Sequence, residues 1–503
     1  MLPGPAFATA MLYVPLRAVP NVPALLKALK VSYIEKEESY EDDFGETGEA
    51  EKLGMTEYEE VVCYDLDIPG YIGVPRHWGM KEFSHLPYVD RTVLKQKQPE
   101  LFRHSIKARD EAQRAFWEEL RSILDQPGPQ DVVANARTGT GKTISALWML
   151  EEVIQAPMLV TVPNNFLRAQ WNERIVDTMG RTWAQKYVGH IQQDIMDYEG
   201  RLITIGLAPS LAIRNYPLEL RRHHTAILFD EWHKVGAPRM SLVLRKYPAR
   251  VRIGLTATNR RDALLRVCTL HLGKPRVKST QEVMHPQVYV AKYRRTLSPR
   301  FRIASEFHMI TALSQFHDRN EMLANILLDY GWHRDRHVVA LSDRTDQLVT
   351  MRALLIERGV PPENVGILCG TYKRPIFDEY AGRTVVKKIA MSDDEKAHIA
   401  GTCNIILTTW GQFDTGADID RLDMGVELTP RGNLRQGIGR ILRIKEGKET
   451  PEWYGVDDDI MHYVETGTTL FADPRPVAYT PLHDLAAARR ASYEFQRGTV
   501  NEL

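Results

Sequence analysis

Residues 136–143 read Ala136-Arg137-Thr138-Gly139-Thr140-Gly141-Lys142-Thr143, and this stretch decides the fold class of the chain. It fits the phosphate-loop pattern GxxxxGK[ST], except that alanine stands at the first glycine position. Glycines let backbone N–H groups approach phosphate oxygens closely, and the helix that follows presents its positive end to the anion. In such a loop Lys142 reaches the β- and γ-phosphates of ATP, and Thr143 holds Mg²⁺. We expect the nucleotide to be bound by Thr138, Gly139, Thr140, Gly141, Lys142 and Thr143.

An acidic pair closes the apolar run at residues 226–229. Asp230 and Glu231 follow that run directly, so they stand at the carboxyl end of an expected strand, where parallel sheets bind their ligands. Asp230 is the expected Mg²⁺ residue, together with Thr143. Glu231 is expected to orient and activate the attacking water.

A second group of polar residues lies more than 290 residues further along the chain, at 436–443. Gln436, Arg440 and Arg443 are spaced by four and three residues, so a helix places all three on one side. Arginine suits the charge that develops on a transferring phosphoryl group, and an arginine finger is worth ~10³–10⁵ in rate. We expect these three residues, with Lys142, Asp230 and Glu231, to form the catalytic set.

Short apolar runs alternate with helix-like stretches in two long regions, a pattern that predicts two parallel sheets covered by helices on both faces. Residues 111–124 are expected to form a helix before the first sheet. Proline-bounded, strand-like pieces near the N-terminus predict a small α+β accessory domain, and the residues after about 450 predict a helical appendage with a frayed end. The runs are 132–134, 158–162, 202–205, 226–229 and 251–255 in the first region, and 337–341, 365–368, 404–407 and 424–428 in the second.

These regions give four expected domains: an accessory domain at 1–100, a nucleotide-binding domain at 101–285, a second sheet domain carrying the arginines at 286–455, and a C-terminal tail at 456–503. The length of 503 residues fits two to four domains. Each expected sheet region has the size of an ordinary domain.

Composition excludes several classes of protein. The chain is 43% apolar and 26% charged, as in globular domains. It has no apolar run of membrane-spanning length and no secretory pattern at its start, so we expect no membrane partner. The four cysteines are scattered without a CxxC pair, which favours a reducing cytosol over a zinc site or disulfides. They are Cys63, Cys268, Cys369 and Cys403.

Charge is balanced overall but unevenly spread. The formal net charge is zero, whereas nucleic-acid-binding proteins often carry a basic excess. Residues 35–60 contain twelve acidic residues against two lysines, a local balance of −10, and read as a solvated loop. The stretch from Lys292 to Arg302 is basic. A balanced total can therefore conceal a basic groove on one face.

The motifs and their order resemble those of superfamily 2 helicases of the DExH type, which have two RecA-like lobes. The resemblance covers about residues 105–446. The matching stretches are 136–143 (motif I), 159–171 (motif Ia), 230–233 (motif II), 256–258 (motif III), Thr409 with 415–420 (motif V, with Thr415 in place of the usual Glu) and 436–443 (motif VI).

The resemblance implies roles for further residues. It implies that Gln113 reads adenine, while Arg109 stands four rather than three residues before it and departs from the pattern. Gly416 and Asp418 join the nucleotide-binding set, and His233, Thr256, Thr258 and Gln436 link hydrolysis to movement. Two alternatives stay open for Trp232 and Trp410: each is either a core aromatic or a platform on which a base stacks. The nucleic-acid contacts implied are Asn164, Arg168, Ser210, Ser342 and Thr409.

Within that superfamily the stretch at 436–443 and the run at 419–423 look most like bacteriophage DNA helicases of the UvsW type, and are similar to the XPB-like group. This implies an ATP-dependent DNA helicase or translocase that remodels branched DNA with 3′–5′ movement. Its partners would be single-stranded, forked or junction DNA and recombination or replication proteins. A monomer in the cytoplasm is expected, the host's cytoplasm for a phage protein.

Three alternatives stay open at this point. DExH motors serve both nucleic acids, so an RNA helicase fits the same motifs. A nucleotide-gated binding scaffold would need no strand separation, although Lys142, Glu231, Arg440 and Arg443 all being present argues against one. A restriction-system motor subunit also fits, but we find no nuclease-like PD…ExK pattern near either end of the sequence.

Overall fold

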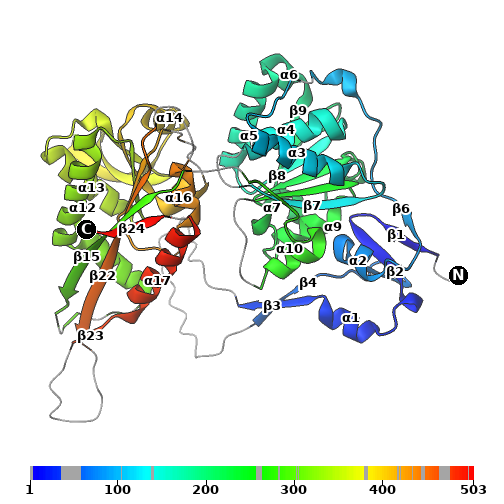
Figure 1. Ribbon diagram of the computed structural model, residues 1–503, viewed down its shortest axis with the longest axis horizontal. Helices are drawn as coiled ribbons and strands as arrows, with labels where there is room; N and C mark the ends of the chain where they lie inside the picture. The colour runs from blue at the N-terminus through cyan, green and yellow to red at the C-terminus, as the bar shows by residue number, and fades with distance from the viewer. Residues whose placement is uncertain are drawn as a thin grey trace, which may run out of the picture. The chain divides into compact units, whose positions relative to one another are not determined.

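The computed structural model describes residues 4–34, 58–103, 105–136, 141–256, 263–280, 284–298, 300–301, 303, 305–415, 419, 421–432, 434–442, 448–463, 476–496 and 498–503, apart from 379–382. The chain divides into two compact units, Met1–Gln281 and Glu282–Leu503, each drawn with its own sheet and helices in Figure 1. Most of the acidic stretch, residues 35–57, lies outside the described residues. No helix among the described residues is long and apolar enough to span a bilayer.

The first unit is built on an eight-stranded sheet in the order β10-β9-β11-β8-β12-β13-β7-β14. Neighbouring strands are parallel except β9 and β10. The strands are β7 (Gln130–Asn135), β8 (Met158–Val162), β9 (Val188–Gln192), β10 (Ile195–Met196), β11 (Ile203–Leu207), β12 (Ala226–Asp230), β13 (Val251–Thr256) and β14 (Val277–Lys278).

Helices cover both faces of this sheet, which is why its central strands are mostly apolar and buried. Val132 and Ala134 of β7 pack into one core, and Val133 between them packs into the core on the opposite face. The first core includes residues of α3 (Glu111–Leu124), α4 (Lys142–Met149), α5 (Asn165–Met179) and α6 (Arg181–Tyr187). The second includes residues of α7 (Ala208–Ile213), α8 (Leu218–Arg221), α9 (Val243–Lys246) and α10 (Leu265–Leu272).

The N-terminal residues form a separate four-stranded sheet in the order β5-β2-β1-β6. Its apolar side shares one core with Leu264, Val267 and Leu270 in the α10 region of the large sheet. The elements are β1 (Ala6–Ala8), β2 (Met11–Pro15), β5 (Tyr71–Pro75), α2 (Arg76–Glu82) and β6 (Tyr88–Asp90), with α1 (Val22–Ala28) and the hairpin of β3 (Lys30–Ile34) and β4 (Tyr58–Val62) beside them.

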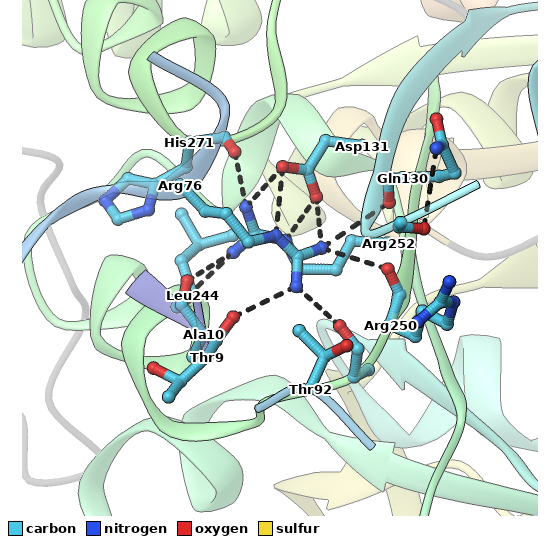
Figure 2. Close-up of polar contacts among 12 residues, drawn as sticks. Thr9, Ala10, Arg76, Thr92, Gln130, Asp131, Leu244, Arg250, Arg252 and His271 are labelled. Carbon is cyan, nitrogen blue, oxygen red and sulfur yellow. Dashed lines mark hydrogen bonds and ion pairs between the residues drawn. The ribbon is translucent and has the colours of Figure 1, made fainter. Parts of the chain in front are cut away.

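A buried ionic cluster joins the two sheets of this unit (Figure 2). Asp131 on β7 lies between two guanidinium groups, 2.5 Å from Arg76 Nη2 and 2.6 Å from Arg252 Nε. Arg76, on α2, also donates to the carbonyls of Thr9 and Ala249 at 3.0 and 2.6 Å. Burial alone would raise the pKa of Asp131, but the charges of Arg252 and Arg76 outweigh it and hold that pKa well below its usual range.

The sequence-based boundary at residue 100 therefore coincides with a change of sheet inside one compact unit. Whether residues 1–100 count as a domain of their own stays a prediction, as do the other boundaries at 285 and 455.

The second unit contains a sheet in the order β17-β20-β16-β21-β22-β15-β24, parallel throughout, with β23 antiparallel on β22. A separate antiparallel hairpin is formed by β18 (Thr371–Asp378) and β19 (Arg383–Ala390). The sheet strands are β15 (Gln287–Thr296), β16 (Val338–Ser342), β17 (Val365–Leu368), β20 (Ile405–Thr409), β21 (Met424–Glu427), β22 (Glu452–Tyr463), β23 (Pro476–Ala478) and β24 (Thr499–Glu502).

Helices again lie on both faces of this sheet (Figure 1). One core contains residues of α11 (Glu306–Gln315), α12 (His317–Ile326) and α13 (Thr345–Glu357), and the other contains residues of α15 (Trp410–Thr415), α16 (Arg435–Ile441) and α17 (Thr480–Phe495). A further helix, α14, spans Asp393–Thr402.

The C-terminal residues differ from the expected appendage with a frayed end. The expected helix is present as α17, but β22 and β24 on either side of it pair with β15 inside the sheet. Ordered pairing of the last strand replaces the fraying that sequence position suggested. The fold class itself, mixed α/β with two tandem parallel-sheet units, is confirmed.

Candidate nucleotide site

Three strands of the first unit bring the predicted residues to one edge of the sheet. β7 precedes the phosphate loop, β12 ends at Asp230, and β13 ends at Thr256. In the parallel register Asp230 lies beside Leu255, and Thr256 lies beside Asn135. Motifs I, II and III therefore share the carboxyl edge at which open α/β sheets bind ligands.

The phosphate loop enters α4 through Gly141. This glycine has a φ of +81°, a left-handed backbone conformation that residues other than glycine rarely adopt. A Cβ atom there would stand 2.6 Å from Gln113 Nε2, so the loop and the predicted adenine-reading glutamine are in close contact. The Gln113 carboxamide oxygen accepts a hydrogen bond from the Arg109 backbone N–H at 2.8 Å.

Lys142 and Glu231 meet across this edge. Lys142 Nζ is 3.6 Å from Glu231 Oε1, and the two side chains are only 15% and 17% exposed. An ammonium and a carboxylate in such a partly buried position attract each other more strongly than they would in open water. The predicted phosphate-binding lysine and water-activating glutamate are thus brought together.

Asp230, like Glu231, is partly buried. Burial raises its pKa first, and the neighbouring Glu231 raises it further, while Lys142 and a hydrogen bond from Trp171 oppose the rise. Trp171 Nε1 donates to Asp230 Oδ2 at 2.8 Å. Trp171 has no predicted role beyond its place in motif Ia, and that place is the signal that points to it.

His233 connects the acidic pair to motif III. Its Nδ1 atom lies 3.0 Å from Thr256 Oγ1 and 3.3 Å from Glu231 Oε2. Thr256 is fully buried at the end of β13. Lys142, Glu231, His233 and Thr256 thus form a continuous polar chain from the phosphate loop to motif III, which we call the motif chain.

The donor set fits ATP and Mg²⁺. Asp230 and Glu231 lie side by side at this edge. A bound cation would stabilise the charged form of Asp230 and so oppose the rise in its pKa. Mg²⁺ prefers oxygen ligands such as carboxylates and hydroxyls, together with substrate phosphates. Asp230 and Thr143 would hold the metal, and Lys142 would bind the phosphates.

The second unit holds Arg440 on α16. Ile438 and Ile441 of this helix are fully buried, and they fix it on the sheet. Arg440 stays partly exposed, with its guanidinium 5.7 Å from the centre of the Phe413 ring. Gly437 of the same helix packs against Trp410 and Trp453, and a Cβ atom there would stand 3.4 Å from each ring.

Several predicted residues lie outside the described residues, and their predictions stay untested. They are Thr138, Gly139, Thr140, Thr258, Gly416, Asp418, Arg443 and the Gln436 side chain.

The predicted nucleic-acid residues show varied surroundings. Asn164 caps α5 by accepting from the Leu167 backbone N–H at 2.9 Å. Arg168 hydrogen-bonds Gln192, and Ser210 Oγ accepts from Gln193 N at 3.4 Å, so these residues gather around the β9–β10 turn.

In the second unit Ser342 pairs with Thr409 in register across β16 and β20. Thr409 Oγ1 accepts from Gln412 N at 3.3 Å. The Ser342 side chain is fully buried. Trp232 and Trp410 are also buried, at 1% exposure each, so both are core aromatics rather than exposed stacking platforms.

The fold and the candidate site together define the class of protein. The chain is an α/β protein with two parallel-sheet units, and its first sheet presents a phosphate-loop lysine and an acidic pair at one carboxyl edge. The family model for the res subunit of type III restriction enzymes matches residues 92–261, which contain this edge.

Known proteins similar to the chain extend the match. A putative ATP-dependent RNA helicase of Acanthamoeba polyphaga mimivirus, L396, is 24% identical over 396 residues, which cover 76% of this chain and 70% of the relative. The DNA 3′-5′ translocase XPB2 of Sulfurisphaera tokodaii is 27% identical over 246 residues, covering 48% of this chain and 50% of the relative. The resemblance to superfamily 2 helicases is therefore confirmed.

Among solved structures, T4 UvsW is 15% identical with a TM-score of 0.31, over 87% of this chain and 90% of that one. The Escherichia coli DEAH/RHA helicase HrpB is 14% identical with a TM-score of 0.46, over 68% of this chain and 42% of that one.

Proposed function

We propose that this chain is an ATP-dependent DNA helicase or translocase that remodels branched DNA. The observation that supports the proposal most directly is the motif chain, because it links the group that would bind phosphate to the strand end expected to sense nucleic acid. The similarity to the XPB2 translocase supports DNA as the substrate and 3′–5′ as the direction.

In this proposal Lys142 neutralises the β- and γ-phosphates, and Gly141 allows the backbone to approach them. Glu231 accepts a proton from the attacking water while its contacts with Lys142 and His233 hold it in place. Mg²⁺, when bound, shields the phosphate charge. Arg440 and Arg443, carried by the second unit, stabilise the charge that develops on the transferring phosphoryl group. Residues 1–100 direct the motor to its branched substrate.

The first test is ATP hydrolysis with and without DNA. We expect DNA-stimulated turnover in the wild type and loss of at least a hundredfold in Glu231→Gln, with ATP binding retained because the lysine is untouched. Arg440→Ala should lose turnover without losing ATP affinity. Absence of hydrolysis stimulated by either DNA or RNA in the wild type would overturn the enzyme proposal and favour a binding scaffold.

The second candidate is an RNA helicase, favoured by the name of the mimivirus relative. Matched DNA and RNA strands of one sequence separate the two, since both present the same bases and differ at the 2′-hydroxyl. Stronger stimulation of ATP hydrolysis by the RNA strand would favour an RNA helicase over a DNA helicase.

Branched-substrate preference needs its own assay. Unwinding and branch migration are compared on forked, four-way-junction and linear duplexes, each with and without ATP. We expect ATP-dependent conversion of forks and junctions to exceed that of linear duplex. Equal conversion of all three would contradict the branched-DNA part of the proposal and leave the helicase part standing.

A further inference from the structure

Ser342, a predicted nucleic-acid contact, has its hydroxyl engaged inside the second unit. The hydroxyl donates to Gln347 Oε1 at 2.6 Å and accepts from the Arg344 backbone N–H at 2.9 Å. It therefore shapes the turn that leaves β16 and sets the position of Arg344. The group that this turn presents at the carboxyl edge of the sheet is the side chain of Arg344, two residues further on.

The Arg344 guanidinium is held over an aromatic ring. Its Cζ atom lies 3.9 Å from the centre of the Phe307 ring. Three hydrogen bonds fix it there: Nε to Thr311 Oγ1 at 2.9 Å, Nη1 to the Asp343 carbonyl at 3.1 Å, and Nη2 to the Phe307 carbonyl at 3.1 Å. A guanidinium held this way loses little freedom when it takes part in a stack.

Phe307 is the exposed part of this arrangement. It lies in the first turn of α11, and 57% of its surface is exposed although it is a large apolar side chain. The next residue along the chain, His308, stacks on Phe301, with the ring centres 5.7 Å apart and 21° between the ring planes. Phe301, Phe307, His308 and Arg344 together are called the ring platform below.

Charge alone does not explain the platform. The sequence from Lys292 to Arg302 is basic, but three of its cations form ion pairs within the unit, so their charge is largely offset. In the sequence, exposed Arg300 precedes Phe301 of the platform. The acidic residues Glu306 and Asp343 precede Phe307 and Arg344. Flat rings rather than a phosphate-binding cluster are therefore what this surface offers. The ion pairs are Lys292–Glu502, Arg294–Asp459 and Arg295–Asp318.

We propose that the ring platform stacks against unpaired bases of a single strand, and this rests on the proposed function. Every base has a flat face, so such stacking is tolerant of sequence, as a motor that moves along a strand requires. Arg344 follows Ser342 at the carboxyl end of β16, where Thr409 of β20 lies in register, so the platform includes a residue of the sheet edge that carries both predicted nucleic-acid contacts. The platform binds bases, and Ser342 holds the backbone of Arg344 in place through its hydrogen bond.

The test compares Phe307→Ala and Phe307→Trp with the wild type in binding an oligo-dT strand that carries 2-aminopurine. Stacking of one base is worth about 1–3 kcal/mol, so we expect Phe307→Ala to weaken binding about tenfold and to lose the fluorescence quenching. Phe307→Trp should restore both. An abasic strand of equal length should bind all three proteins alike. Phe495→Ala, at a ring 38% exposed on α17, is the matched control and should bind like the wild type.

Two results overturn the inference. One is wild-type affinity and quenching in Phe307→Ala, and the other is an equal loss of affinity for the abasic strand. Thermal melting of each variant identifies any loss of fold, and the Phe307→Trp result then decides the matter. If nucleic acid stimulates wild-type ATP hydrolysis in the same experiments, such a failure belongs to the platform alone. If nothing stimulates hydrolysis, the proposed function fails first.

Discussion

Glu231 combines a proposed chemical role with an uncommon backbone conformation. Its φ of 52° is one of four positive values found at non-glycine positions among the described residues. Such a conformation costs on the order of 1 kcal/mol and persists where surrounding contacts hold it in place. Here Lys142 and His233 hold the side chain from two directions. The turn after β12 therefore stores a small strain that aims the carboxylate along the sheet edge.

His233 and Thr256 should act as a unit in coupling hydrolysis to nucleic-acid binding. Their atoms are 3.0 Å apart, so removing either side chain breaks the same contact. We expect His233→Ala and Thr256→Ala each to lower DNA-stimulated hydrolysis about tenfold and to lower unstimulated hydrolysis by a smaller factor. The double variant should be no worse than the single ones.

The measurement is steady-state ATP hydrolysis at saturating DNA and without DNA. Thr256→Ser keeps the hydroxyl and serves as the matched control, with stimulation close to the wild type. Additive losses in the double variant would show that the two residues act separately, which contradicts coupling through their contact.

Motif spacing was enough to predict that Lys142, Asp230, Glu231 and His233 lie near one another, because each follows an apolar strand whose end is visible in the sequence. Their roles stay predictions. The spacing did not reveal the bond from Trp171 to Asp230 or the internal hydrogen bonds of Ser342. Those partners depend on which strands and helices become neighbours, and a polar residue at a strand end looks the same whether it faces solvent or the interior.

At the scale of elements, α17 supports the arginine-bearing helix α16. Ser492 Oγ accepts from the Leu434 backbone N–H, just before α16, at 3.3 Å. The Tyr493 hydroxyl donates to buried Glu427 at 2.7 Å, and Trp453 Nε1 donates to the same oxygen at 2.7 Å. The C-terminal segment thus takes part in positioning α16 on the sheet.

Ser492→Ala should lower the turnover number of ATP hydrolysis about three- to tenfold. The change releases the start of α16, while the Michaelis constant for ATP should stay the same because the phosphate loop belongs to the other unit. In an Arg440→Ala background the same change should have a smaller effect, since the helix then carries no Arg440 to misplace.

Steady-state kinetics of the four proteins in this cycle provide the measurement. Tyr493→Phe is a second variant that removes one hydroxyl without changing the size of the ring, and it should act in the same direction. A raised Michaelis constant, or a loss of equal size in the Arg440→Ala background, would contradict a role through α16.

Buried strands were predictable and amphipathic ones were not. The structure gives β8 and β17 the limits that their apolar runs suggested, because a strand covered on both faces is apolar throughout. β15 and β22 contain charged residues, and their sequences predict only a basic stretch and a tail. Their charged residues pair with partners far along the chain, as Asp458 of β22 does with Arg319. No local sequence pattern predicts such partners.

At the scale of the whole molecule, the N-terminal sheet is built into the first unit, and His77 on α2 contributes to that junction. A Cβ atom on Gly273, just after α10, would lie 2.5 Å from His77 Nε2. Burial lowers the pKa of His77 to about 4. Because this lies below its ordinary value of 6.5, protons bind the unfolded chain preferentially, and stability falls as the pH drops from 6.5 toward 4.

We therefore expect His77→Gln to show a shallower loss of stability than the wild type over that pH window. The measurement is the free energy of unfolding from urea titrations at several pH values between 7 and 4. Part of the slope should remain, because buried His224 and His271 also have lowered pKa values. His317→Gln, with a side chain 83% exposed, is the control and should keep the wild-type slope. An unchanged slope in His77→Gln would contradict the assignment.

The buried cluster of Arg76, Asp131 and Arg252 makes the N-terminal sheet necessary for the stability of the first unit. Removing one partner of a buried ionic group leaves a charge uncompensated and costs about 3–5 kcal/mol. Arg76→Met should therefore destabilise the protein strongly, since carbonyls of Thr9 and Ala249 also lose their donor. Asp131→Asn should be worse, because two buried guanidinium groups then lose their only carboxylate in the cluster.

The control for this prediction is Arg250→Met. Arg250 pairs with Asp90 at 2.6 Å and also bridges the two sheets, but its side chain is 24% exposed, and the loss should be about 1 kcal/mol or less. Urea unfolding of the three variants measures the order. Equal, small losses in all of them would mean that the cluster does not join the sheets. The expected order implies that a chain beginning at residue 101, which lacks Arg76, would unfold at lower urea concentration than the full chain.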